Sequence, residues 1–115
     1  MIFVFGSNLA GRHGKGAALT ARIDFGAQYG VGIGRTGDAY AIPTKGYKLE
    51  VLPYFIIKQE VDKFILYAYK HLELEFYITR VGCGLAGYKD DEIGPLFANV
   101  PSNCTLPIRW KQYKK

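Results

Sequence analysis

The segment IFVFGSNLAGRHGKGAALTA, from Ile2 to Ala21, decides the fold because it passes from a strand through a loop into a helix. Residues 2–5 are apolar and include two β-branched types, which predicts a short strand buried on both faces of a parallel sheet. Gly6 is expected to end this strand. A polar, glycine-rich loop follows, and the apolar spacing then predicts a helix that begins at Gly16 and fades near Tyr29.

The loop between this strand and this helix has the composition of an anion-binding site. Glycines let the backbone approach a ligand closely, and the unpaired N–H groups of a first helical turn attract negative charge. Arg12, His13 and Lys15 add basic side chains at the same place. The loop matches neither the dinucleotide fingerprint nor the P-loop pattern, so an ordinary surface turn is the alternative interpretation.

Further strands and helices alternate along the rest of the chain. Residues 40–42 form an apolar segment ended by Pro43, and Thr44 and Lys45 follow at the predicted carboxyl end of that strand. A helix is expected from just after Pro53 to His71, since apolar residues recur there at helical spacing.

The last third of the chain repeats this alternation. Residues 75–81, EFYITRV, predict a strand, and it runs into a second glycine-rich loop at residues 82–88. Acidic residues from Asp90 begin a short helix that reaches about Ala98. A final strand is expected over residues 104–110, at an edge of the sheet because it contains a proline.

One connection lacks a clear pattern. Residues 30–40, GVGIGRTGDAY, predict a flexible loop in which Arg35 and Thr36 are candidates for ligand contact. A plain surface turn is the competing interpretation.

The totals set limits on the class of protein. The chain has 115 residues and predicts a single domain over residues 1–115, with a formal net charge of +5 that suits an anionic ligand or nucleic acid. No segment resembles a membrane span or a signal peptide, so a cytoplasmic protein is expected. Cys83 and Cys104 lack metal-ligand spacing and are expected to be buried thiols. No metal and no cofactor are predicted.

Together these elements predict an α/β fold, a compact three-layer arrangement in which helices cover both faces of a mostly parallel sheet. The carboxyl ends of parallel strands meet at one edge of a sheet. Both glycine-rich loops and the Thr44–Lys45 pair should therefore meet at that edge and form one phosphate-binding cleft.

Three segments resemble motifs of the macrodomain family, whose members bind ADP-ribose. They are GSNLAGRHGKGAA at residues 6–18, AIPTKG at residues 41–46 and TRVGCGLAGY at residues 79–88. The similarity is closest to the branch of DNA ADP-ribosylation antitoxins and terminal ADP-ribose hydrolases, and it extends to small macrodomain-like proteins of phages and bacteria. It implies a macrodomain-like version of the predicted fold and a ligand of the ADP-ribose type.

The resemblance also implies roles for individual residues. Asn8 would lie near the distal ribose, Lys45 would match the lysine that attacks the anomeric carbon, and His13 would donate a proton or bind phosphate. In some members of the hydrolase branch an aspartate follows the Gly-Cys-Gly-Leu turn, where this chain has Ala86, and no acidic residue precedes Asp24 to read adenine. The predicted ligand-contacting residues are Gly6, Ser7, Asn8, Arg12, Gly14, Lys15, Gly16, Ala17, Thr44, Gly82, Cys83, Gly84, Leu85, Ala86 and Gly87.

Three functions remain open at this point. The first is a protein that binds ADP-ribose or a related NAD-derived nucleotide without chemistry, for example to sequester a signalling nucleotide in a phage or bacterial setting. The second is an ADP-ribosyl hydrolase that uses Lys45 with help from His13. The third is a nucleic-acid-binding protein that relies on its net charge. The sequence gives no indication of the oligomeric state.

Overall fold

The computed structural model describes residues 1–115 and shows one five-stranded sheet in the order β2-β3-β1-β4-β5. Strand β2 pairs antiparallel with β3, and every other pairing is parallel. The strands are β1 (Ile2–Asn8), β2 (Gly34–Thr36), β3 (Ala39–Lys45), β4 (Phe76–Ile78) and β5 (Cys104–Thr105). The helices are α1 (Gly16–Phe25), α2 (Tyr54–Lys70) and α3 (Asp90–Ile93), with two 3₁₀ helices, η1 (Gly94–Phe97) and η2 (Ile108–Tyr113).

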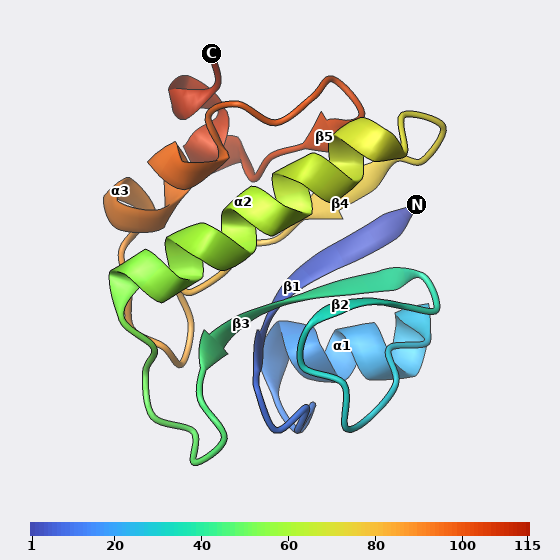
Figure 1. The fold of residues 1–115 in the computed structure, drawn as a ribbon, viewed down its shortest axis with the longest axis vertical. Helices are drawn as coiled ribbons and strands as arrows, with labels where there is room; N and C mark the ends of the chain where they lie inside the picture. The colour runs from blue at the N-terminus through green and yellow to red at the C-terminus, as the bar shows by residue number, and fades with distance from the viewer.

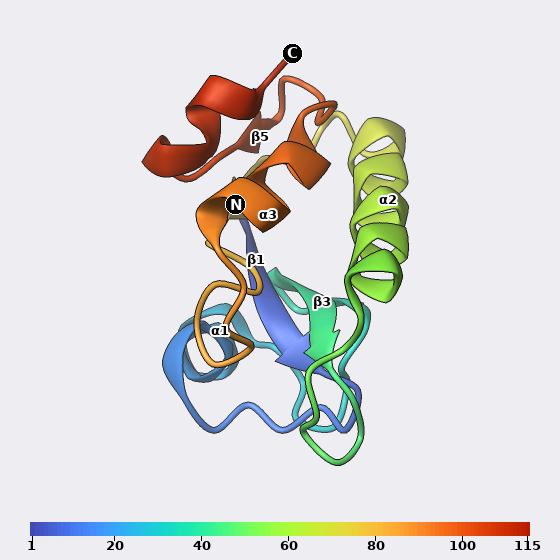
Figure 2. The same cartoon turned by 90° about the vertical axis from the view of Figure 1, so that its left-hand side faces the viewer.

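The two long helices cover opposite faces of the sheet, as the predicted three-layer α/β fold requires. Figure 1 shows α2 crossing in front of the strands, and Figure 2 shows β1 and β3 lying between α1 and α2. Alternate residues of β1 supply the two faces: Ile2 and Val4 belong to the core under α2, and Phe3 and Phe5 belong to the core under α1.

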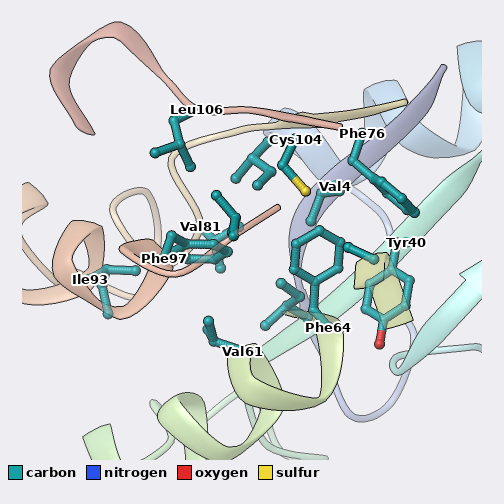
Figure 3. Close-up of a cluster of buried hydrophobic side chains, with 14 of the residues drawn as sticks. Val4, Tyr40, Val61, Phe64, Phe76, Val81, Ile93, Phe97, Cys104 and Leu106 are labelled. Carbon is teal, nitrogen blue, oxygen red and sulfur yellow. The ribbon is translucent and has the colours of Figure 1, made fainter. Parts of the chain in front are cut away.

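The larger core lies between the sheet and α2. Phe64 of α2 is fully buried, with its ring centroid 5.0 Å from that of Tyr40 and 5.4 Å from that of Phe76. Figure 3 shows Phe64 and Val61 of α2 among residues from several strands and from η1. This packing follows from the apolar stripe of α2, whose helical spacing the sequence displays.

The smaller core, under α1, is built from small residues. Ala18 and Ala21 of α1 pack with Ala39 and Ala41 of β3, and short side chains let the helix lie close to the sheet. The ring of Phe3 stacks on a phenylalanine of α1, Phe25, at a centroid distance of 4.5 Å. Close approach of α1 places its amino end beside the carboxyl end of β1.

Strand β1 is longer than predicted, because it continues through Gly6 to Asn8. Gly6 pairs with Ile42 in the ladder with β3, so this glycine is part of the strand rather than its end. On the other side β4 stops early, where Ile78 pairs with Val4. The carboxyl end of β1 therefore has a strand partner on one side only, and a crevice can open on the other.

This crevice lies at the point where the chain reverses its direction across the sheet. The path from β1 leads through α1 to β3 on one side, and α2 then carries it over to β4 on the other side. In open α/β sheets ligands bind at such switch points, beyond the carboxyl ends of the strands. The topology alone therefore predicts a ligand-binding site in the space between the ends of β1 and β4.

Three further features differ from the sequence-based expectations about the strands. The predicted flexible loop contains β2, which lengthens the sheet at one edge. Pro43 lies within β3 rather than ending it, which is tolerated because β2 pairs only as far as Ala41. The last strand is only Cys104–Thr105, and Pro107 then caps the 3₁₀ helix η2.

The helix boundaries also differ in detail. Helix α1 ends at Phe25 because Gly26 adopts a left-handed conformation, with φ +72°, and its N–H bonds to the carbonyl of Ala21. Helix α2 begins directly after Pro53, as predicted, and ends next to His71. The predicted helix from Asp90 is one α-helical turn that continues as η1.

Other sequence-based expectations concern thiols, metals and membranes. Cys104 is buried and Cys83 is half-buried, and neither forms a disulfide. No group of three or more histidine, cysteine, aspartate or glutamate side chains could together hold a metal ion. None of the helices combines the length and the apolar composition needed to cross a membrane.

Candidate functional site

A cleft of about 800 Å³ opens at the carboxyl edge of the sheet, where the sequence predicted it. This volume is typical of a small-molecule site. Fourteen of the fifteen predicted ligand-contacting residues line the cleft, and the predicted nucleophile Lys45 does so too. Gly87 and the predicted catalytic His13 do not belong to its lining. The lining set from the prediction is Gly6, Ser7, Asn8, Arg12, Gly14, Lys15, Gly16, Ala17, Thr44, Lys45, Gly82, Cys83, Gly84, Leu85 and Ala86.

The floor of the cleft is formed where the two glycine-rich loops leave the sheet. A Cβ atom placed on Gly6 would lie 3.3 Å from the backbone nitrogen of Gly82 and 3.6 Å from Cγ2 of Thr44. Strands β1 and β3 thus meet the first residue of the second loop at Gly6, Thr44 and Gly82. The buried Thr44 hydroxyl donates a hydrogen bond of 3.3 Å to the carbonyl of Ser7, which fixes β3 against β1.

The first loop is held in shape by its own polar groups. The side-chain amide of Asn8 donates to the carbonyl of Arg12 and accepts from the backbone N–H of the same residue, both at 2.9 Å. The hydroxyl of Ser7 donates to the carbonyl of Gly32. Asn8 therefore closes the turn that presents Arg12, and the predicted contact between Asn8 and a ribose stays a prediction.

The amino end of α1 leaves its backbone amides free. Lys15 is the N-cap residue and its side chain makes no capping hydrogen bond. The N–H groups of Gly14 through Ala18 have no hydrogen-bond acceptor in the protein. Each of these residues lines the cleft, so the positive end of the helix dipole lies at its wall.

The second loop provides another run of free amides. Within it, Cys83 N–H bonds to Arg80 and Tyr88 N–H bonds to Gly82, which closes the turn. The N–H groups of Gly84, Leu85 and Ala86 have no acceptor in the protein. Gly87 N–H bonds to Gly84 at 3.0 Å and supports the turn, and Gly87 does not belong to the lining of the cleft, so its predicted ligand contact stays a prediction.

The charges that line the cleft are all positive. Arg12, Lys15, Lys45 and Arg80 belong to its lining, and no aspartate or glutamate does. Arg12, Lys15 and Lys45 form no salt bridge within the protein, so their charge is available to a ligand. The cleft is therefore suited to an anion, and it contains no carboxylate that could act as a general acid or base.

Cys83 lines the cleft but is a poor nucleophile. Burial, reinforced by the negative charge of Asp90, raises the pKa of the Cys83 thiol to about 11. Only the thiolate attacks readily, and a raised pKa lowers its population at physiological pH.

His13 lies outside the cleft, contrary to its predicted catalytic role. Its side chain is fully buried under α1, with its ring edge-on to Phe5 at 5.3 Å and near Tyr29 at 6.1 Å. Nε2 donates to the carbonyl of Val31 at 3.2 Å, and Nδ1 has no partner. His13 therefore holds the loop in place through aromatic contacts that the local sequence does not reveal.

Arg35 and Thr36 are also placed away from the cleft. Both lie in β2 at the far edge of the sheet, where Arg35 donates to the carbonyl of Gly37. Thr36 accepts a hydrogen bond from the backbone of Gln28. Arg35 Nη1 also donates to the hydroxyl of Tyr67 on α2 at 3.5 Å.

Two lining residues of chemical interest were not predicted. Arg80 lines the cleft and belongs to the segment TRVGCGLAGY, but the sequence pattern does not mark it as a ligand-contacting residue. Leu49 lies on the loop after β3 and has a positive φ of 64°, for which its sequence offers no signal.

Comparisons with known proteins show the fold and no more. No protein-family model matches the chain, and no curated protein sequence matches it. A solved structure, described as that of a protein of unknown function from Bacteroides thetaiotaomicron, superposes with a TM-score of 0.59 and 17% sequence identity. The match covers 91% of this chain and 86% of that one. None of these comparisons bears on the macrodomain resemblance, which stays a prediction.

The two kinds of glycine in the second loop predict different costs of substitution. Gly82 has φ +80°, and a Cβ there would lie 3.3 Å from Ile93, whereas a Cβ at Gly84 would meet no atom within 4 Å. We expect Gly82→Ala to lower the free energy of unfolding by about 1–2 kcal/mol, the cost of a left-handed backbone. Gly84→Ala should change it by less than about 0.5 kcal/mol. Urea denaturation measures both, and equal losses would contradict the described geometry of the loop.

The buried His13 predicts that acid destabilises the fold. Burial lowers the pKa of His13, the hydrogen bond to Val31 opposes this, and the charge of Arg22 adds to the lowering. Because the unfolded chain binds the proton more readily, stability is full above the usual histidine pKa and falls as the pH drops below about 6.5. One proton bound only by the unfolded chain limits the slope to at most about 1.4 kcal/mol per pH unit.

The measurement is the free energy of unfolding between pH 7.5 and pH 5.5. His13→Phe loses the Val31 hydrogen bond and is expected to be less stable throughout, but its profile over this range should be flatter than that of the wild type. His71→Gln, which leaves His13 in place, is the matched control. An unchanged slope in His13→Phe would show that this ring does not titrate on unfolding.

Proposed function

We propose that this chain binds ADP-ribose or a related NAD-derived nucleotide in the cleft and does not cleave it. The observation that carries the proposal is the pairing of two runs of free amides, one at residues 14–18 and one at residues 84–86, around a single cleft. A diphosphate is an anion of the size and charge that two such runs hold. The macrodomain resemblance is the reason for proposing that the diphosphate belongs to ADP-ribose or a related nucleotide. Sequestration of a signalling nucleotide is the corresponding biological role.

The lining of the cleft favours binding over hydrolysis. Cleavage of a glycosidic bond usually depends on an acid or base at the reacting carbon. The cleft has no carboxylate in its lining, His13 is buried elsewhere, and the thiol of Cys83 is protonated. Lys45, which lines the cleft without a salt bridge, is the one feature that supports a hydrolase as a second candidate.

The charge distribution also favours a small ligand over nucleic acid. Three cations without a salt bridge belong to one concave site instead of forming a stripe along the surface. Binding of a nucleic acid through net charge would weaken steeply with salt, because counterions are released at each contacted phosphate. A nucleotide enclosed by backbone amides should depend less on salt.

Calorimetry tests the proposal with purified protein at fixed salt. We expect the wild type to bind ADP-ribose with a Kd below about 100 µM and adenosine at least tenfold more weakly, because adenosine lacks the diphosphate. Lys45→Gln should weaken ADP-ribose binding by roughly three- to tenfold. Lys70→Gln, which removes an exposed cation at the far end of α2, is the matched control and should bind like the wild type.

Three outcomes would overturn the proposal. A wild type that does not bind ADP-ribose would refute the proposal. Equal losses of ADP-ribose affinity in Lys45→Gln and Lys70→Gln would indicate binding through net charge and hence a nucleic-acid ligand. Release of ADP-ribose from an ADP-ribosylated oligonucleotide by the wild type, abolished in Lys45→Ala, would replace binding by hydrolysis. The last result would also identify Lys45 as the nucleophile.

A further inference from the structure

Arg80 is the lining cation whose orientation the structure fixes. It follows β4, lies at the start of the second loop, and its side chain is 45% exposed. Its Nε donates to one carboxylate oxygen of Asp90 at 2.8 Å, and its Nη2 donates to the other at 2.7 Å. This two-point contact holds the guanidinium plane, whereas Arg12 and Lys15 have no such side-chain partner.

Asp90 is itself held in place from behind. The indole Nε1 of Trp110 donates to Asp90 Oδ1 at 2.7 Å, and Trp110 is fully buried, stacked on Phe97 at a centroid distance of 5.3 Å. The hydrogen bonds from Arg80 and then Trp110 hold the pKa of Asp90 well below its usual range. The carboxylate therefore stays ionised and fixed between η2 and the cleft.

The remaining hydrogen-bond capacity of Arg80 is considerable. A guanidinium has five N–H donors, and Asp90 takes two of them, one on Nε and one on Nη2. The opposite edge of the guanidinium is formed by Nη1 and the second N–H of Nη2. It has no acceptor in the protein. This edge has the geometry that binds a phosphate through two parallel hydrogen bonds.

We propose that Arg80 is a phosphate-binding residue of the cleft and that Asp90 and Trp110 are the residues that position it. The proposal deepens the proposed nucleotide function and rests on it for the identity of the ligand, but the chemistry it requires is only a phosphate group. It also makes η2, near the carboxyl end of the chain, part of the binding site, because Trp110 belongs to η2.

A purely structural role is the competing explanation. The Arg80–Asp90 pair also ties the second loop to α3, and a strut of that kind would affect stability without affecting phosphate affinity. The chain offers a matched control in Arg109, whose Nη1 lies 3.6 Å from Asp90 Oδ2 but which does not line the cleft. Arg80 and Arg109 therefore contact the same carboxylate, but only Arg80 belongs to the lining of the cleft.

The experiment measures the affinity of the full chain for inorganic pyrophosphate and, separately, for ADP-ribose. We expect Arg80→Gln to weaken pyrophosphate binding at least about tenfold and Arg80→Lys to recover part of that loss, because lysine keeps the charge but not the fork. Arg109→Gln should bind like the wild type. Asp90→Asn keeps the shape of the positioning group and should weaken pyrophosphate binding by about three- to tenfold, with Arg80 still present.

A spectroscopic readout covers the case in which Arg80→Gln does not fold. In wild-type protein labelled with ¹⁵N-arginine, the Nε–H signal of Arg80 should shift on addition of pyrophosphate and that of Arg109 should not. Pyrophosphate affinity unchanged by Arg80→Gln, an unmoved Arg80 signal, or an equal loss in Arg109→Gln would overturn the inference.

The two proposals fail separately. A wild type that binds pyrophosphate through Arg80 but does not bind ADP-ribose keeps this inference and removes the proposed function. ADP-ribose binding that is unchanged by Arg80→Gln keeps the proposed function and refutes this inference. Binding of neither ligand overturns both.

Discussion

The arrangement of the cleft depends on the close approach of two backbones, that of Gly6 in β1 and that of Gly82 after β4. A side chain at Gly6 would crowd the nitrogen of Gly82 at 3.3 Å, so glycine at this position lets the two loops leave the sheet side by side. The early end of β4 supplies the space in which they diverge. The cleft is thus a result of strand lengths as much as of loop sequences.

The electrostatics of the cleft follow from this geometry. Two loops that diverge from one point direct the amino end of α1 and the turn at residues 84–86 toward the same space, and backbone amides of both remain without acceptors. Unpaired N–H groups near a surface are stabilised by water or by an anion, and the surrounding cations favour the anion. No aspartate or glutamate belongs to the lining of the cleft that Lys45 shares.

The sequence predicted the features that local pattern and chain topology determine. Helix α2 shows a clear apolar stripe, and parallel strands must bring their carboxyl ends together, so the meeting of Lys45 with both glycine-rich loops was predictable. Long-range packing decided the rest. The local sequence predicts that Gly6 ends its strand, and its close approach to Gly82 explains why it does not. The local sequence also predicts His13 as a ligand residue, whereas its ring packs against Phe5. The orientation of Arg80 depends on Asp90 and on Trp110, which lies in a segment predicted as a strand.

The measurement that tests the account most directly is an amide NMR titration of the ¹⁵N-labelled wild type with ADP-ribose. The account predicts that the amide signals of residues 14–18 and 84–86 shift together along one binding curve, because both runs contact the same diphosphate. Signals of β2 and β5, which lie at the two edges of the sheet, should stay in place. Shifts confined to one loop, or two loops that titrate with different affinities, would contradict a single shared anion site.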